Sequence, residues 1–295
     1  MKKTIAVIGA DGQLGTDLLA ALEDASDQLV VPLTISDMNV CDFEQTRSTL
    51  MVNSPDIVIN TAAFHRVDEC ETRSEDAFLT NAAAVHNLAR VCKDMGSTLV
   101  HFSTDYVFDG APDRALPFSE DDRPDPKSVY AISKLAGEYA VRTAWERHFV
   151  VRTCGLYGRA GAYQSNASRS FVETMLGLAR SGKPLKVVND QRLTPTATVD
   201  LAAKLVELIG TSAYGLYHIT NTGSCTWYEF AVELFRLAGV KPDLQAVTSA
   251  QWNSPAKRPA YSVLRHDALR HAGLAPLRSW QEALASYIEG RQVDV

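Results

Sequence analysis

The chain has 295 residues, of which 46% are hydrophobic and 22% are charged, and its formal net charge is −6 with a pI near 5.7. A length of this order predicts about two domains. The acidic balance gives no electrostatic basis for binding nucleic acid or an anionic membrane surface. No apolar run approaches the ~20 residues of a membrane-spanning helix, so we expect no membrane partner.

The N-terminus leads from a basic start through a short apolar run directly into a glycine motif. This order predicts a first strand and not a signal peptide. The five cysteines are odd in number and widely spaced, and they form no Cys-x-x-Cys pair. They favour neither a disulfide framework nor a zinc site, so we expect reduced thiols, a cytoplasmic location and no metal site.

The first half of the chain alternates strand-like and helix-like patterns. Short apolar, mostly β-branched runs are typical of strands buried on both faces of a parallel sheet. These runs are Ile5–Ile8, Leu29–Leu33, Ile57–Asn60, Leu99–Phe102 and Phe149–Arg152. The helical patterns between them are Gln13–Glu23, Phe43–Met51, Glu75–Lys93 and Val129–Ala144. The order predicts an α/β fold over residues 1–153, a Rossmann-like doubly wound parallel sheet.

After residue 153 the alternation loosens. The predicted elements are a loop at 160–166, helices Ser168–Arg180, Val199–Ile209, Thr226–Ala238 and Trp280–Ile288, and strands Leu185–Val188 and Gly215–Ile219. No Ser/Pro-rich linker or repeat separates the two halves. We therefore expect residues 154–295 to form mainly a smaller α/β lobe for substrate, with about residues 199–222 returning to the first sheet.

A glycine-rich loop, Gly9-Ala10-Asp11-Gly12-Gln13-Leu14-Gly15, follows the first predicted strand and opens the first helix. Glycines at this spacing allow a tight turn and let a pyrophosphate approach the backbone at the positive end of the helix. The alternative is a glycine turn that only joins packed elements. The strand before the loop and the helix after it favour a dinucleotide site, which makes residues 1–153 an NAD(P)-binding domain.

The sequence leaves the choice between NAD and NADP open. An acid at the end of the second strand commonly binds the adenosine ribose and favours NAD. Residues 31–36 contain no such acid, the first being Asp37, and no arginine is present there for a 2′-phosphate. The missing acid favours NADP slightly, so the expected cofactor is NADPH or NADH.

Tyr130 and Lys134 are four residues apart and share one face of a predicted helix. A free phenol has a pKa of about 10, and a neighbouring ammonium brings that pKa nearer neutrality, so the phenol can exchange a proton with an alcohol oxygen. Lys134 can also bond the nicotinamide ribose. Thr104, at the end of the fourth strand, can donate to the same substrate oxygen, and Asp105 can orient the substrate. Although Tyr-x-x-x-Lys is common by chance, its place behind a glycine loop favours hydride-transfer chemistry.

The third predicted strand ends in small residues, which let the backbone approach a cofactor or simply pack a helix on the sheet. Two roles stay open for His65, which either touches nicotinamide or substrate or is a surface residue. Asn81 is expected to be a buried polar residue that ties backbone together, without a catalytic role.

With these residues in place, the chain resembles the dTDP-4-dehydrorhamnose reductase family of extended short-chain dehydrogenase/reductases. The resemblance covers nearly the full length. It rests on the glycine loop and on blocks 67–71, 103–110, 130–138, 190–196, 215–218, 226–231 and 258–262. The later blocks mark the family and not only the superfamily.

The resemblance implies reduction of the C4 ketone of a nucleotide-linked 6-deoxy-4-ketosugar, dTDP-4-dehydrorhamnose to dTDP-L-rhamnose. It implies that Tyr130 protonates the new alkoxide while Lys134 tunes the tyrosine and holds the ribose. The implied substrate contacts are Thr104, Asp105, Gln191, Thr194 and Arg258. The implied cofactor contacts are Gly9, Asp11, Gly12, Gln13, Leu14, Gly15, Asn39, Val40, Ala62, Ala63, Phe64, Tyr130 and Lys134.

Four positions depart from the family pattern. Gly155 stands where the family usually has a tryptophan that shapes the sugar pocket, and Ser170-Phe171-Val172 replaces Asn-Phe-Val. Both leave the identity of the sugar open. Asn39 aligns with an aspartate that commonly contacts adenosine, and Phe64-His65 replaces a Tyr-Thr or His-Thr pair.

Several alternatives stay open. Gln191 and Thr194 can instead belong to a rigid loop, and Arg258 to an ion pair between the lobes. The whole chain can be a reductase or epimerase for another nucleotide sugar, or a non-catalytic regulatory subunit resembling the methionine adenosyltransferase β subunit. The retained Thr–Tyr–Lys residues and the 226–231 block favour the enzyme. A homodimer is one compatible oligomeric state.

Overall fold

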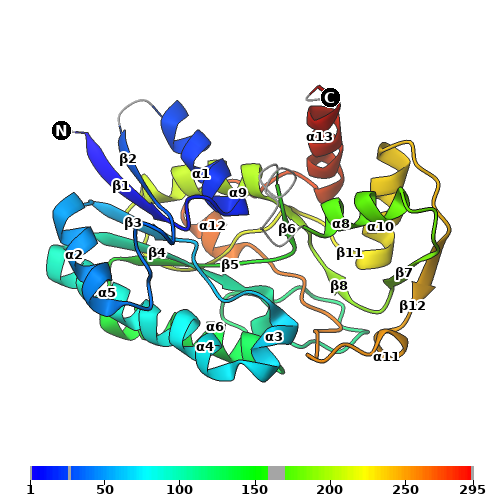
Figure 1. The fold of residues 1–295 in the computed structure, drawn as a ribbon, viewed down its shortest axis with the longest axis horizontal. Helices are drawn as coiled ribbons and strands as arrows, with labels where there is room; N and C mark the ends of the chain where they lie inside the picture. The colour runs from blue at the N-terminus through cyan, green and yellow to red at the C-terminus, as the bar shows by residue number, and fades with distance from the viewer. Residues whose placement is uncertain (1, 26–27, 159–169, 294–295) are drawn as a thin grey trace.

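The computed structural model describes residues 2–25, 28–158 and 170–293, and its centre is a six-stranded sheet in which all neighbouring strands run parallel (Figure 1). In spatial order the strands are β10 (Gly215–His218), β5 (His148–Thr153), β4 (Thr98–Thr104), β3 (Ile57–Asn60), β1 (Lys3–Ile8) and β2 (Gln28–Leu33). The strand order reverses between β1 and β3. Ligands of doubly wound sheets bind beyond the carboxyl ends of the strands at such a reversal. The fold class predicted from the sequence is confirmed.

Helices cover both faces of this sheet (Figure 1). One face carries α1 (Gln13–Asp24), α9 (Thr198–Ile209) and α12 (Asp267–His271), and the other carries α2 (Phe43–Asn53), α5 (Ala84–Met95) and α6 (Val129–Ala144). Successive strand residues point to opposite cores, as Val7 and Ile8 do. Burial on both faces explains the continuous apolar runs of β1, β3, β4 and β5.

The segment at 75–93 differs from the single helix that its pattern predicts. It runs through α4 (Ser74–Phe78), a π-helical turn η1 (Leu79–Ala83) and then α5. A further short helix, α3 (Val67–Thr72), precedes it. The π-helical turn carries Asn81, and turns of this kind are frequent at functional sites.

The other predicted elements of the first half agree closely with the observed ones, and the predicted helix at 129–144 is reproduced residue for residue. The predicted loop at 160–166 and the start of the predicted helix at 168–180 lie outside the described residues. The described part of that helix is α8 (Phe171–Ala179).

The second part of the chain adds a smaller group of helices and short strands. Helices α8, α10 (Trp227–Leu237) and α13 (Trp280–Val293) enclose a separate core that includes Tyr157 and Phe230. Short strands pair two by two: β6 (Leu156–Tyr157) with β9 (Thr196–Ala197), β7 (Leu185–Val188) with β12 (Leu244–Val247), and β8 (Arg192–Leu193) with β11 (Cys225–Thr226). The connecting segments contain η2 (Asp105–Val107) and α11 (Ser249–Trp252).

Two later segments run back to the first sheet. Helix α9 packs against α1, and β10 pairs with β5 so that Leu216 lies opposite Val150. Further on, isolated bridges join Tyr261 to Gly110 and Leu264 to Phe118. The functional division of the chain at residue 153 stays a prediction.

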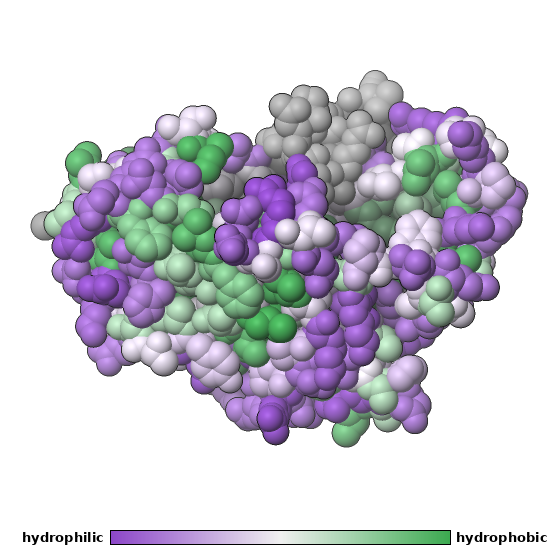
Figure 2. Space-filling model, turned by 60° about the horizontal axis from the view of Figure 1, so that its bottom comes forward, coloured by the Kyte–Doolittle hydropathy of each residue, from purple (hydrophilic) through white to green (hydrophobic). Residues whose placement is uncertain are grey.

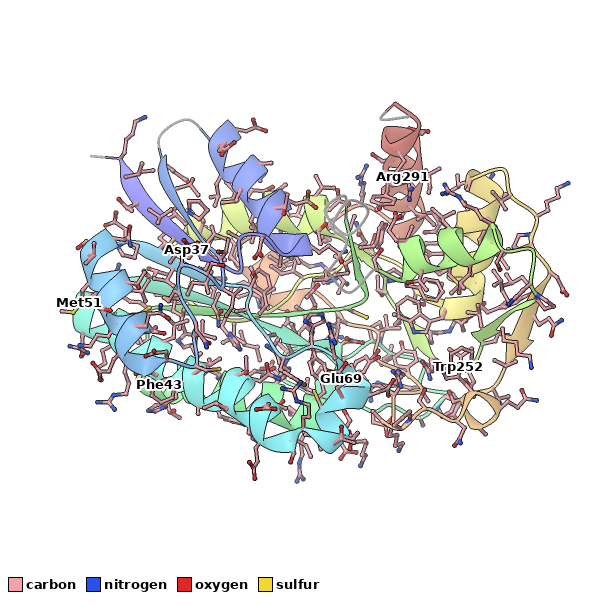
Figure 3. The ribbon with its side chains drawn as sticks, viewed as in Figure 1. Asp37, Phe43, Met51, Glu69, Trp252 and Arg291 are labelled. Atoms are coloured by element: carbon pink, nitrogen blue, oxygen red, sulfur yellow. The ribbon has the colours of Figure 1, made fainter. Side chains whose placement is uncertain are left out.

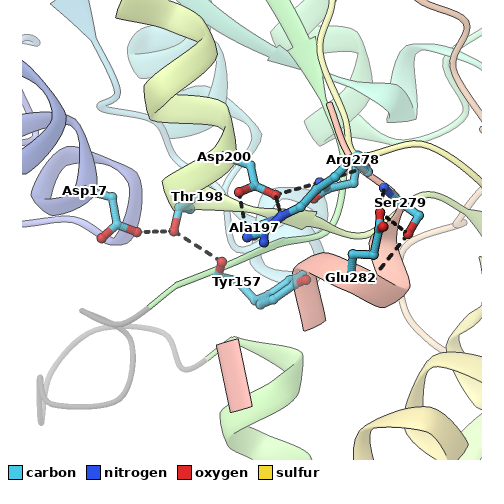
Figure 4. Close-up of polar contacts among 9 residues, drawn as sticks. Asp17, Tyr157, Ala197, Thr198, Asp200, Arg278, Ser279 and Glu282 are labelled. Carbon is cyan, nitrogen blue, oxygen red and sulfur yellow. Dashed lines mark hydrogen bonds and ion pairs between the residues drawn. The ribbon is translucent and has the colours of Figure 1, made fainter. Parts of the chain in front are cut away.

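Polar contacts fix the seam between α1, α9 and the start of α13 (Figure 4). Thr198 Oγ1 bonds a carboxylate oxygen of Asp17 and lies 3.2 Å from the carbonyl oxygen of Tyr157. The carboxylate of Asp200 accepts two hydrogen bonds from Arg278, at 2.9 and 2.8 Å. The loop before α13 is thereby tied to the helix that covers the first sheet.

The surface around α4 to α6 mixes polar regions with apolar patches (Figure 2). Phe78, Leu79 and Ile132 are among its exposed apolar residues. Within the described ranges, no helix is both long enough and apolar enough to cross a membrane.

Candidate active site

The loop between β1 and α1 is shaped by glycines. Gly9 has φ +75°, a conformation that residues with a side chain rarely adopt, and a Cβ there would lie 2.6 Å from Thr61 Oγ1. A Cβ on Gly15 would lie 2.2 Å from the carbonyl oxygen of Gly9. The loop backbone therefore lies directly against α1 and the end of β3, at the reversal of strand order.

The start of α1 fits a dinucleotide pyrophosphate. The first N–H groups of a helix have no partner within the helix, and the N-cap residue Gly12 supplies no capping side chain. Gln13 Nε2 is buried and has no hydrogen-bond partner among the described residues. A phosphate would meet both of these donors at the positive end of the helix dipole. The side chain of Leu14 packs in the core and is 6% exposed.

The region after β2 is organised around Asp37 (Figure 3). The Asp37 carboxylate accepts hydrogen bonds from Thr34 Oγ1 and N at 2.7 and 2.8 Å, and these bonds lower its pKa. Asn39 Oδ1 accepts from the backbone of Cys41 at 3.0 Å, and Val40 is buried. Both polar side chains thus already stabilise this turn.

The backbone after β3 is held by two asparagines. Asn60 Oδ1 accepts from Ala62 N at 3.1 Å. Asn81 bonds both backbone groups of Phe64, at 2.9 and 3.0 Å, and also donates to Ser133 Oγ at 3.0 Å. The expectation that Asn81 ties backbone together is confirmed. His65 is exposed.

Tyr130 and Thr104 meet beyond the carboxyl end of β4. Helix α6 begins at Val129, where Ser128 Oγ caps it by accepting from Ala131 N at 3.3 Å, and this places Tyr130 in the first turn. Burial is the largest influence on Tyr130 and raises the pKa of its phenol, while a hydrogen bond with Thr104 lowers that pKa. The ammonium effect expected from the sequence is therefore not the dominant one.

Lys134 lies one turn further along α6 and is 3% exposed. Its Nζ donates to the carbonyl oxygen of Phe102 on β4 at 2.6 Å. Burial lowers the pKa of Lys134 to about 8, and the negative charge of Glu138 acts in the opposite direction. The ammonium is thus fixed beside the strand that ends in Thr104.

Asp105 is a buried carboxyl adjoining this cluster. It accepts hydrogen bonds from Ser262 Oγ at 2.5 Å and from Thr104 Oγ1 at 3.2 Å. Burial raises the pKa of Asp105 to about 6, although hydrogen bonds from Cys154, Ser262 and Thr104 pull it back down. Through Thr104 and Cys154, Asp105 links the ends of β4 and β5.

The residues predicted to reach the substrate from the second lobe have other partners. Gln191 Nε2 donates to Ser249 Oγ at 2.9 Å, and Thr194 Oγ1 donates to the carbonyl oxygen of Gly223 at 2.6 Å. Arg258 forms a bidentate pair with Asp68, at 3.0 and 2.9 Å. The contacts of Gln191 and Thr194 match the alternative of a rigid loop. The pair of Arg258 with Asp68 matches the alternative of an ion pair between the two parts of the chain.

Gly155 follows β5 with φ +53°. A Cβ there would lie 3.3 Å from each of three atoms, Leu193 Cδ1, Pro195 Cα and Trp227 Cη2. The ring of Trp227 therefore occupies space beside the position where the family usually carries its own tryptophan.

Two contacts of the site are not predicted from the sequence. Ser262 reaches Asp105 from more than 150 residues away in the chain, and no local pattern signals that pairing. Tyr106 packs edge-on against Tyr130 with ring centroids 5.8 Å apart, and it also bonds Arg258.

Over the residues that the structure describes, no group of three or more His, Cys, Asp and Glu side chains is arranged to hold a metal ion.

A parallel doubly wound sheet, a glycine loop at its reversal and a Thr–Tyr–Lys cluster at the end of β4 define an extended short-chain dehydrogenase/reductase. A protein-family model described as RmlD substrate binding domain matches residues 2–293. The chain therefore belongs to the dTDP-4-dehydrorhamnose reductase family that the sequence motifs predict.

Individual relatives agree with this assignment. The chain is 40% identical over 287 residues to the spore coat polysaccharide biosynthesis protein SpsK of Bacillus subtilis (strain 168), covering 97% of each chain. It is 39% identical over 285 residues to a dTDP-4-dehydrorhamnose reductase of Streptomyces griseus, covering 94% of this chain and 90% of the relative. A crystal structure of dTDP-4-dehydrorhamnose reductase from Bacillus anthracis str. Ames in complex with NADP has a TM-score of 0.92 at 35% identity, covering 98% of this chain and 100% of that one.

Proposed function

We propose that the chain reduces the C4 ketone of a nucleotide-linked 6-deoxy-4-ketosugar with NADPH, the substrate being dTDP-4-dehydrorhamnose and the product dTDP-L-rhamnose. The observation that carries this proposal is the placement of Thr104 and Tyr130 at the carboxyl end of β4, with Lys134 one helical turn along α6 and bonded to the carbonyl oxygen of Phe102 on the same strand. Relatives named dTDP-4-dehydrorhamnose reductase, similar over nearly the full length, support the choice of substrate.

The glycine loop and the start of α1 hold the cofactor pyrophosphate in this proposal, and Ala62 to Phe64 line its path towards Lys134. The bound cofactor supplies a hydride for the C4 carbon. NADPH is favoured over NADH because the acid nearest the end of β2, Asp37, already accepts two hydrogen bonds from Thr34. A similar solved structure contains NADP.

Tyr130 is the proton donor of the reduction. An acid catalyst must carry its proton when the substrate arrives, and burial keeps the phenol protonated by raising its pKa. As the C4 oxygen becomes an alkoxide, the phenol gives up this proton. Thr104 donates a second hydrogen bond to the same oxygen and stabilises the developing charge.

Lys134 and Asp105 position the reacting groups. The ammonium of Lys134 holds the ribose and stabilises the phenolate that remains after proton transfer. Asp105 accepts from a sugar hydroxyl, in competition with its present donor Ser262. Arg258 reaches the nucleotide diphosphate only after it exchanges Asp68 for the phosphate oxygens.

A second candidate is the same reaction on a different 6-deoxy-4-ketosugar. Gly155 favours it, because its φ of +53° and the close approach of Pro195 and Trp227 leave no room for the usual tryptophan. The wall of the sugar pocket is therefore built differently here from the family pattern.

The proposal is tested by NADPH oxidation with a panel of nucleotide 4-ketosugars, comparing wild type with Tyr130→Phe. Loss of a general acid should lower kcat by about 10²–10⁴-fold while NADPH still binds. Tyr139→Phe is the matched control, because this exposed tyrosine lies on the same helix and should leave kcat unchanged.

Three outcomes decide between the candidates. Equal activity of the Tyr130→Phe variant removes Tyr130 as the proton donor. Activity on a sugar other than dTDP-4-dehydrorhamnose selects the second candidate. If the wild-type protein binds NADPH but turns over no 4-ketosugar, and if it captures a methionine adenosyltransferase, the chain is a regulatory subunit.

A further inference from the structure

A buried ionic network lies beneath the candidate active site. Glu138 is 0% exposed and Arg152 is 1% exposed. Arg152 donates to the two carboxylate oxygens of Glu138 at 2.8 and 2.7 Å, and Ser103 Oγ donates to the same carboxylate at 2.5 Å. Three elements, α6, β4 and β5, meet at this one side chain.

The network continues on its far side. Arg152 Nη1 lies 3.3 Å from His218 Nε2, and His218 Nδ1 lies 3.1 Å from the carbonyl oxygen of Arg265. Burial, followed by the charge of Arg152, holds the pKa of His218 well below its usual value. The imidazole is therefore neutral, donates to the carbonyl and accepts from the guanidinium, so the arginine is fixed from both ends.

Glu138 is also one helical turn from Lys134, on the same face of α6. Lys134 Nζ bonds the carbonyl oxygen of Phe102, and Glu138 bonds the hydroxyl of the next residue, Ser103. The residue after that is Thr104. Two consecutive contacts thus set α6 against the strand end that carries the site.

The charged surroundings of Lys134 make Glu138 its main favourable partner. Burial disfavours the ammonium, and the carboxylate of Glu138 opposes that effect. His101 of β4 is the other ionisable group coupled to Lys134, and it is neutral because burial holds its pKa well below the usual value. Asp105 and Cys70 act on Tyr130 and not on the ammonium. The charged side chains of α3, α4 and α5, which pack on the other sides of α6, are half-exposed or exposed.

We propose that Glu138 is a positioning residue for the reduction, whose fixed negative charge keeps Lys134 in its ammonium form beside Tyr130. Ser103 and Arg152 hold the carboxylate in place for this role. The inference rests on the proposed function for the meaning of Lys134, but it concerns a different residue and a separately measurable property.

The pair is poorly explained by stability alone. Removing two charges from water costs free energy that their attraction often fails to recover, so well-packed apolar residues usually serve a core equally well. Glu138 and Arg152 nevertheless lie in the core directly under the site. A requirement for a negative charge near Lys134 accounts for this arrangement.

The test is the pH dependence of NADPH affinity in Glu138→Gln, which keeps the shape of the side chain and removes its charge. A neutral amine is a weaker donor than an ammonium, so NADPH affinity should fall as Lys134 loses its proton. We call this fall of NADPH affinity with rising pH the alkaline limb. In wild type it should be centred near pH 8, the pKa of Lys134. In Glu138→Gln it should move down by about one pH unit, and the alkaline limb of kcat should move with it.

Asp200→Asn is the matched control. It breaks a bidentate arginine–carboxylate pair of similar geometry on α9, which covers the opposite face of the sheet. This variant should lose stability and keep the alkaline limb of wild type. If Glu138 had a merely structural role, Glu138→Gln would also lose stability and keep the alkaline limb of wild type. An unchanged alkaline limb in Glu138→Gln therefore overturns the proposal.

A second variant covers the case in which Glu138→Gln does not fold because Arg152 is left unpaired. Glu138→Gln/Arg152→Gln removes both charges, and its limb should still move below that of wild type. If it does not, or if Asp200→Asn shows an equal shift, the proposal is wrong. Because the limb is measured by NADPH binding, failure to turn over any 4-ketosugar would count against the proposed function and not against Glu138.

Discussion

Gly155→Ala tests whether the departure at the end of β5 is built into the backbone. Two separate effects oppose a side chain there. The first is conformational, since φ is +53° and a residue with a Cβ in the left-handed region loses roughly 1–2 kcal/mol. The second is steric, since the new Cβ would lie 3.3 Å from the backbone atom Pro195 Cα as well as from two side chains.

A control separates these two effects. Gly96 caps α5 with φ +72°, and a Cβ there would meet no atom within 4 Å. Gly96→Ala therefore carries the conformational cost alone, roughly 1–2 kcal/mol. Overpacking costs typically ~1–3 kcal/mol, so Gly155→Ala should destabilise by roughly 2–5 kcal/mol in total.

Urea unfolding of both variants measures the difference directly. The expected result is a midpoint for Gly155→Ala clearly below that of Gly96→Ala, with unchanged slopes. Gly155→Trp should unfold still more easily, because the ring would have to displace Trp227. Equal free energies of unfolding for the two alanine variants would refute the steric part of the reasoning. A Gly155→Ala variant as stable as wild type would refute all of it.

Two further predictions concern the cofactor loop and the buried carboxyl. Gly15→Ala should reduce NADPH affinity at least about tenfold in a fluorescence titration, because its Cβ would lie 2.2 Å from the Gly9 carbonyl oxygen and must push the loop away from α1; unchanged affinity would contradict this. Folding raises the pKa of Asp105 from 3.8 to about 6, so its contribution to stability is complete below the lower value and is lost as pH rises through the higher one. Wild type should therefore lose about 3 kcal/mol relative to Asp105→Asn between about pH 4 and 7, and parallel stability curves would disprove the shift.

The sheet could be predicted from the sequence because β3, β4, β5 and most of β1 are buried on both faces, while the edge strand β2 keeps an apolar run although it is only partly buried. A continuous β-branched run between turns and amphipathic helices is typical of a strand in such a sheet. The short strands β6, β8, β9 and β11 offer no such signal. Each has only two residues, and each exists because a distant partner strand lies beside it.

The residues of the candidate site also fall into those that a local sequence pattern predicts and those that depend on distant partners. Thr104, Tyr130 and Lys134 could be predicted because strand ends and helix spacing are local properties of the chain. The π-helical turn around Asn81 could not, since helix periodicity does not distinguish one widened turn inside a long apolar pattern. The partners of Asp105 and Glu138 are also out of reach, because Ser262 and Arg152 approach them from other elements.

The segment at 256–265 explains why the later sequence blocks identify the family better than the glycine loop does. It runs beside Gly110 and Phe118 of the first part, and it delivers Arg258 to Asp68 and Ser262 to Asp105. Each of these contacts requires a particular residue in both parts of the chain at once. A glycine loop needs only small residues and a following helix, which many nucleotide-binding chains satisfy. We therefore expect the residues that select the sugar to include those that this segment brings against Asp105, together with Gly155 and its neighbour Trp227.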